Sequence, residues 1–188
     1  MEFLRKCLRP YVHYEFKKEI IESIFFIIEY GENARDEGLS VMMDLIEDCP
    51  FEKLLILALD GIGNEVWKSK HPESYLRFIY NRIILENEEV RAAAISALGN
   101  IAAHNLSIRP LIQHILSKCL YDTCDEVRDR TNYFLSFFKK EDDLREAQKL
   151  KEAEGEEEVK KITIVEDMLK FQKPGFDINA LETYLLVK

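Results

Sequence analysis

The residues of this sequence best suited to metal or nucleophilic chemistry are four cysteines and four histidines. His114, Cys119 and Cys124 come closest together, in the order His-x4-Cys-x4-Cys. Thiolates and imidazoles bind zinc, but this spacing matches no common zinc motif, and Cys119 falls on an apolar helical stripe. The cysteines form no CxxC pair, so we expect free thiols, no disulfide framework and no metal site.

Motifs for other catalytic chemistry are missing from the sequence. It contains no GxxxxGK[ST] phosphate loop and no GxSxG nucleophile motif, and the "GIG" at 61–63 follows a helical pattern where a dinucleotide site needs a strand. The acidic pair Asp142 and Asp143 belongs to a strongly charged stretch that cannot hold two carboxylates in fixed geometry. We therefore expect no catalytic residue, no cofactor and no small-molecule substrate, and hence no enzyme.

One arginine stands in an unusual place, in "NEEVRAAAISALGNI" at residues 87–101. Asn87 is a suitable N-cap, and the two glutamates after it suit the positive end of a helix dipole, whereas Arg91 does not. The dipeptide Val-Arg recurs at Arg128. We expect Arg91 and Arg128 to pair with an acid or a carbonyl group in the adjoining repeat, a structural role rather than ligand binding.

These arginines belong to a repeat that must position them. "EEVRAAAISAL" at Glu88 resembles "DEVRDRTNYFL" at Asp125, 37 positions later, and the same shift backwards from Glu89 reaches Glu52 and Glu15. Amphipathic helical segments lie between these helix starts, one of them with apolar residues at i, i+3, i+4 and i+7, namely Leu76, Ile79, Tyr80 and Ile83. The repeating unit is therefore two helices, one amphipathic and the next more thoroughly apolar.

A two-helix unit with a period of 37 residues predicts an all-α fold, an α-α superhelix of the HEAT or armadillo-like solenoid type. The alanines after Arg91 would let neighbouring helix axes approach closely. Glycines near the ends of the second helices are expected as left-handed caps: Gly31, Gly61, Gly63 and Gly99. Four aromatic residues near one loop–helix junction form either a contact patch or, in our preferred interpretation, core: Trp67, Tyr75, Phe78 and Tyr80.

The chain divides by composition into three parts. Residues 1–138 are predicted to form the solenoid, and residues 139–161, nearly all charged or small, a solvated helix end and linker. Residues 162–188 resume amphipathic character and are expected to form a C-terminal helix and tail that pack back on the solenoid.

Charge and hydropathy exclude several functions. The net charge of −9 argues against general nucleic-acid binding, because the phosphates would be repelled over most of the surface. No apolar run approaches the ~20 residues of a membrane-spanning helix. The first residues lack the pattern of a signal peptide, so we expect a cytosolic protein.

The run "PESYLRFIYNRIILENEEVRAAAISALGNIA", followed by "EVRDRTNYFL", resembles the trunk of the coatomer gamma subunit family, and the similarity extends over residues 1–138. The resemblance implies an α-solenoid scaffold of the COPI vesicle coat, acting in Golgi-to-ER and intra-Golgi transport. It also implies beta and zeta coatomer subunits and an Arf GTPase as partners, and peripheral association with Golgi membranes on the cytosolic side.

Family members have further solenoid repeats and an appendage that this length does not accommodate, so we interpret the chain as corresponding to the later part of the trunk. No binding residue is transferred, because the Arf and zeta contacts of the family belong mainly to the earlier trunk. The alternative is another adaptor or import-type HEAT-repeat module that binds a peptide or a partner protein. A groove with regularly spaced Asn or Trp would favour that alternative, and the sequence shows no such ladder.

Overall fold

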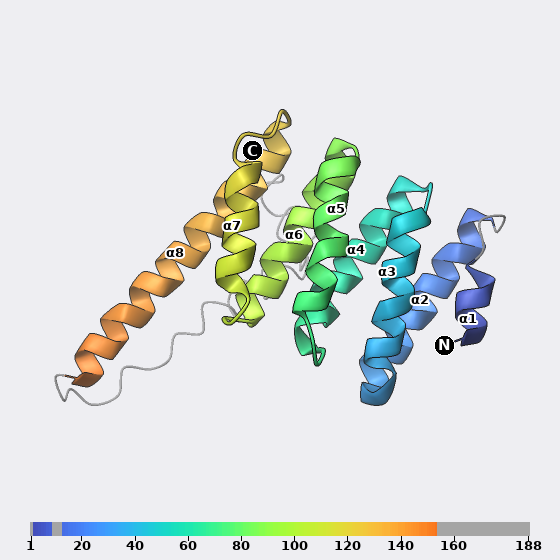
Figure 1. The fold of residues 1–188 in the computed structure, drawn as a ribbon, viewed down its shortest axis with the longest axis horizontal. Helices are drawn as coiled ribbons and strands as arrows, with labels where there is room; N and C mark the ends of the chain where they lie inside the picture. The colour runs from blue at the N-terminus through green and yellow to red at the C-terminus, as the bar shows by residue number, and fades with distance from the viewer. Residues whose placement is uncertain (1, 9–12, 154–188) are drawn as a thin grey trace, which may run out of the picture. The chain divides into compact units, whose positions relative to one another are not determined.

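The computed structural model describes residues 2–8 and 13–153 (Figure 1). It divides into two compact units, Met1–Lys140 and Glu141–Lys188, and the arrangement given below is that of the first unit. The predicted C-terminal helix and tail, residues 162–188, lie outside the described residues.

The described residues contain helices and no strand, which confirms the all-α prediction. The helices are α1 (Glu2–Cys7), α2 (Tyr14–Tyr30), α3 (Arg35–Asp48), α4 (Glu52–Glu65), α5 (Glu73–Leu85), α6 (Glu88–His104), α7 (Arg109–Cys119) and α8 (Asp125–Ala153), with short 3-10 turns η1 (Glu32–Ala34) and η2 (Val66–Lys68).

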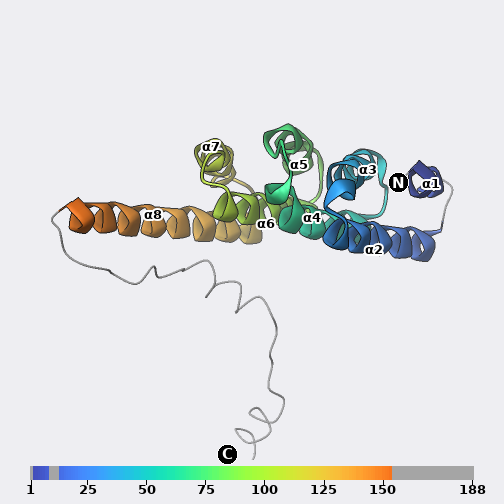
Figure 2. The same ribbon diagram turned by 90° about the horizontal axis from the view of Figure 1, so that it is seen from below.

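The helices of the first unit form two layers. Figure 2 shows α3, α5 and α7 in one layer and α2, α4, α6 and the first turns of α8 in the other. In this second layer α4 contacts both α2 and α6, and α6 also contacts α5 and α7. A helix surrounded in this way must be apolar on most of its circumference, which explains why ten residues of α6 are buried, five of them alanines.

The repeat register fixes where the helices of the second layer begin. They start at Tyr14, Glu52, Glu88 and Asp125, within one residue of the positions that the period predicts. The Asn87 side chain accepts a hydrogen bond from the Val90 amide at 3.1 Å, so the predicted N-cap of α6 is confirmed. Prolines 50 and 72 precede helices, and Pro110 lies in the first turn of α7, as expected for a residue without an amide donor.

The interpretation of the glycines as left-handed helix caps is wrong. Gly61 and Gly63 lie inside α4 and Gly99 lies inside α6, while Gly31, which does end α2, has a φ of −124°. The internal glycines instead allow close approach of helices. A Cβ atom on Gly63 would stand 2.8 Å from the Cα atom of Ala97, so α4 and α6 meet backbone to backbone. Gly61 and Gly99 in the same way receive the rings of Phe25 and Phe134.

Helix α8 runs without interruption from Asp125 to Ala153, through the predicted end of the solenoid at residue 138. Among the α8 residues up to 148, whose side chains are described, the last buried apolar one is Phe138, and the sequence is strongly charged beyond it. The division of the chain at residues 138 and 161 stays a prediction.

The aromatic residues near η2 pack against the core while remaining partly buried, as the preferred interpretation expects: Trp67, Tyr75, Phe78 and Tyr80. The Trp67 ring stacks on the ring of His104, at the end of α6, with centroids 4.4 Å apart and an interplanar angle of 12°. The stacked rings therefore connect η2 with the end of α6.

Candidate interaction site

Arg91 joins two consecutive hairpins. From the first turn of α6, its Nε and Nη2 atoms donate to Oδ2 and Oδ1 of Asp122, at 3.0 and 2.7 Å. Asp122 lies between α7 and α8, in the next repeat. The third nitrogen, Nη1, donates to the backbone carbonyl of Glu86 at 3.1 Å. The guanidinium thus connects the start of its own helix with the loop of the following hairpin, through the two parallel bonds that arginine forms with a carboxylate.

This ion pair is largely removed from solvent, with 17% of the Arg91 side chain and 14% of the Asp122 side chain exposed. Burial acts to raise the pKa of Asp122, but hydrogen bonds from the Arg91 guanidinium and the Cys124 amide outweigh it and hold that pKa below its usual range. The hydrogen bond to Asp122 likewise raises the pKa of Arg91. Both groups are therefore charged at neutral pH, and each neutralises the other.

Arg128, the second predicted arginine, has a different place. Its Nη1 atom donates to the backbone carbonyl of Asp122 at 2.6 Å, and its Nη2 atom pairs with the Asp125 carboxylate. Both partners lie in the loop and first turn that lead into its own helix. Arg128 therefore holds the loop that presents Asp122 to Arg91. We name these three residues, Arg91, Asp122 and Arg128, the Arg91 joint.

An arginine that the sequence analysis missed reaches from α8 back to α6. The Nη1 atom of Arg130 donates to the Ser96 hydroxyl at 2.9 Å and to the Ala92 carbonyl at 3.3 Å. The small side chains at these positions of α6 leave its backbone accessible to a long donor. The sequence signal was the pairing of Ala92 and Ser96, four apart on α6, with a basic residue one repeat later.

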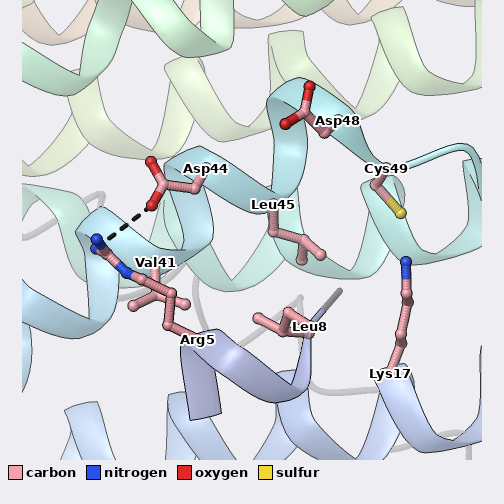
Figure 3. Close-up of a pocket in the computed structure, with 8 residues that line it drawn as sticks. All are labelled: Arg5, Leu8, Lys17, Val41, Asp44, Leu45, Asp48 and Cys49. Carbon is pink, nitrogen blue, oxygen red and sulfur yellow. Dashed lines mark ion pairs between the residues drawn. The ribbon is translucent and has the colours of Figure 1, made fainter. Parts of the chain in front are cut away.

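A second charged cluster lies between α1, α2 and α3, where a pocket of about 140 Å³ opens (Figure 3). We name it the Lys17 pocket; its lining residues are Arg5, Leu8, Lys17, Val41, Asp44, Leu45, Asp48 and Cys49. Arg5 and Asp44 form an ion pair at 3.3 Å. Lys17 is only 2% exposed, and its amino group lies 5.5 Å from the centroid of the Phe51 ring.

The cysteines are free thiols in the structure: Cys7, Cys49, Cys119 and Cys124. Burial raises the pKa of Cys49 and of Cys119, which keeps both thiols protonated and poorly nucleophilic. Cys119 donates a weak hydrogen bond to the Ile115 carbonyl inside α7, whereas His114 of the same helix is exposed. Within residues 2–8 and 13–153, no three His, Cys, Asp or Glu side chains come together as a metal site.

The same described ranges hold no helix long and apolar enough to span a membrane. Consecutive helical hairpins stacked in two layers define the class of α-solenoid repeat proteins. A solved structure of this class, the designed armadillo repeat protein YIII(Dq)4CqI, matches with a TM-score of 0.52 and 22% identity, covering 71% of this chain and 62% of that one. This likeness supports the armadillo-like fold.

Within that class, the chain belongs to the adaptin N-terminal region family, whose model matches residues 1–142. It is 46% identical over 135 residues to a probable coatomer subunit gamma of Caenorhabditis elegans, and 42% identical over 136 residues to the human coatomer subunit gamma-1. Each match covers 72% of this chain and 16% of the relative. The coatomer subunit gamma-2 of Oryza sativa subsp. japonica is 40% identical over 149 residues, or 79% of this chain and 17% of its own length. The chain thus spans about a sixth of these relatives.

Proposed function

We propose that this chain forms part of the trunk of a coatomer gamma subunit and acts as a scaffold in the COPI coat, in Golgi-to-ER and intra-Golgi transport. The observation that carries the proposal is the 46% identity to a coatomer gamma subunit, which runs through consecutive hairpins of the solenoid. A catalytic role is not proposed, since the relatives are named as coat subunits and the charged residues described above serve packing.

The partners follow from the same proposal. Beta and zeta coatomer subunits and an Arf GTPase would bind the complete trunk, and the coat would bring the chain to the cytosolic face of Golgi membranes. The stacked hairpins support this role, because a solenoid presents a long surface on which several chains can bind.

Within the scaffold, we propose that Arg91 transmits orientation from one hairpin to the next, with Arg128 holding the loop in place. Loss of this connection would let the hairpins of α5–α6 and α7–α8 move against each other. The geometry of the Arg91 joint supports this role, since its bidentate bonds fix both distance and angle.

The test is affinity purification of the full reading frame, tagged at its genomic locus. We expect beta- and zeta-type coatomer subunits in the eluate and a Golgi pattern for the fluorescent fusion. A control carries Arg77→Met, on the exposed side of α5, and should co-purify the same subunits. If the chain instead purifies with a different protein and no coatomer subunit, the alternative of an adaptor or import-type peptide-binding module replaces this proposal.

A further inference from the structure

Two cations and two carboxylates line the Lys17 pocket, and Lys17 is the cation without an ion-pair partner in the described part of the chain. Lys17 is 2% exposed, yet among the described residues no carboxylate lies within ion-pair distance of its amino group and no oxygen accepts a hydrogen bond from it. The ring of Phe51, 5.5 Å away, is its closest favourable contact. The amino group is not among the buried side-chain atoms that lack a partner, so it opens to the pocket and is available to a carboxylate or another acceptor that enters.

The repeat register shows which residue would pair with Lys17 from within the chain. Lys17 occupies the position of Arg91 two repeats earlier, and Asp48 occupies the position of Asp122; each pair is separated by 31 residues. Asp48 does line the pocket, but Figure 3 shows its carboxylate turned away from Lys17, whose amino group points toward Cys49. The equivalent of the Arg91 joint is therefore open, and its cation faces the pocket.

The other walls of the pocket specify what can enter. Leu8, Val41 and Leu45 supply an aliphatic surface, and Arg5 neutralises Asp44 at the rim. The volume of about 140 Å³ is far below the several hundred Å³ of pockets that hold whole cofactors. A single carboxylate-bearing side chain with an aliphatic neighbour fits this size, this cation and these walls.

We propose that the Lys17 pocket binds an acidic side chain of a partner polypeptide. The carboxylate accepts hydrogen bonds from the Lys17 amino group, and an adjacent leucine-like side chain packs on the aliphatic wall. Asp48 competes for the same cation and repels the incoming charge, so its rotation regulates access. This inference does not depend on the coat role, because it rests on the pocket and the register alone.

The experiment titrates the full 15N-labelled chain by NMR with the peptide acetyl-Leu-Glu-Leu-amide. Acetyl-Leu-Gln-Leu-amide is the matched uncharged peptide, and inorganic phosphate and acetate test whether any small anion binds. We expect the Glu peptide to shift amide signals of α1, α2 and α3, and to bind roughly tenfold or more tightly than the Gln peptide, as one charge-assisted hydrogen bond implies.

Three variants locate the binding. Lys17→Met should weaken the Glu peptide roughly tenfold or more, while Lys18→Met, the neighbouring lysine paired with Glu22 on the surface of α2, should leave it unchanged. Asp48→Asn should tighten binding by about threefold, because it removes a nearby negative charge. Asp48 is exposed, so Asp48→Asn should fold normally. Its effect on peptide affinity therefore tests binding in the Lys17 pocket even if Lys17→Met fails to fold.

Equal binding of the two peptides would overturn the proposal, and so would equal effects of Lys17→Met and Lys18→Met. Phosphate or acetate binding as tightly as the Glu peptide would show a simple anion site instead. Absence of any shift with both wild type and Asp48→Asn would also overturn the proposal, because the pocket would then bind no carboxylate even when Asp48 no longer competes for Lys17. None of these results bears on co-purification with coatomer subunits.

Discussion

Two regions of the solenoid use the same pair of repeat positions differently. In the middle, Arg91 and Asp122 form a closed, bidentate ion pair, whereas near the start Lys17 and Asp48 line an open pocket. The acid explains part of the difference: Asp122 accepts a further hydrogen bond from the Cys124 amide at 2.9 Å, while Asp48 is the exposed last residue of α3. The basic residue at this repeat position forms an ion pair where the loop after the next helix holds the acidic residue in place, as it does for Asp122.

The helix contacts of these two regions also differ, and again the contact in the middle is the tighter one. In the middle, Gly63 meets the backbone of Ala97, so neither side can move without shifting a helix axis. Nearer the start, Gly61 of α4 meets the end of the Phe25 ring, which can rotate away. The contact of Gly63 with Ala97 therefore tolerates an added methyl group less well than the contact of Gly61 with Phe25, and four pairs of substitutions test the differences between the two regions.

The largest effect is expected for Arg91→Met. It leaves the Asp122 carboxylate largely buried without its cation, and should lower the free energy of unfolding by about 3 kcal/mol. Lys17→Met, which removes a cation that has no ion-pair partner, should change it by less than about 1 kcal/mol. Chemical denaturation followed by circular dichroism measures both, with Arg77→Met as the exposed control. Equal losses at residues 17 and 91 would contradict the comparison.

The second-largest effect is expected at the glycines where helices touch. Gly63→Ala places a methyl group against the Ala97 backbone and should cost about 2 kcal/mol, although alanine favours a helix more than glycine does. Gly61→Ala should cost less than about 1 kcal/mol, because the Phe25 ring can shift and the helix gains propensity. Thermal melts of the two variants decide this prediction, which fails if Gly61→Ala proves the more damaging.

A smaller effect should appear on acidification. The folded-state pKa of Asp122 lies below its unfolded value, so its ion pair contributes stability above about pH 4, the usual aspartate value. That contribution is lost as the pH falls through the folded-state pKa. Unfolding free energies measured from pH 7 to pH 2 should therefore fall less steeply at the acid end for Asp122→Asn. The same measurement on Arg91→Met is the matched test, and an acid-end slope equal to that of wild type in both variants would contradict the prediction.

The smallest effect is expected from closing the open pair. Lys17→Arg provides a longer, forked donor that can reach Asp48, and should raise the free energy of unfolding by about 0.5 kcal/mol. The double variant Lys17→Arg with Asp48→Asn is the control and should show no gain. A gain that persists in the double variant would assign the effect to packing and not to the ion pair.

The repeat period was sufficient to predict the fold class and the helix starts of the second layer, because a spacing of 37 residues carries both the charged caps and the apolar faces. The role of the glycines was not predictable in the same way. A glycine near a helix end gives the same sequence signal whether it caps the helix or receives a neighbouring backbone. The structure distinguishes these two roles, because it places the Ala97 backbone directly against Gly63.

The charged site was predicted in part. Arg91 was singled out because its charge opposes the helix dipole, but Asp122 lies 31 residues away and no local pattern connects them. Lys17 was missed because its repeat carries Phe-Lys in place of Val-Arg, and Arg130 because its acceptors are a hydroxyl and a backbone carbonyl of another helix.

The stacking of Trp67 on His104 gives this protein an intrinsic fluorescent probe. The chain has a single tryptophan, so all intrinsic indole fluorescence comes from the junction of α4 and α6. The emission of an indole depends on the ring stacked against it, so separation of the Trp67 and His104 rings would change the fluorescence. Emission can therefore follow the separation of η2 from the end of α6 in real time, without any attached dye.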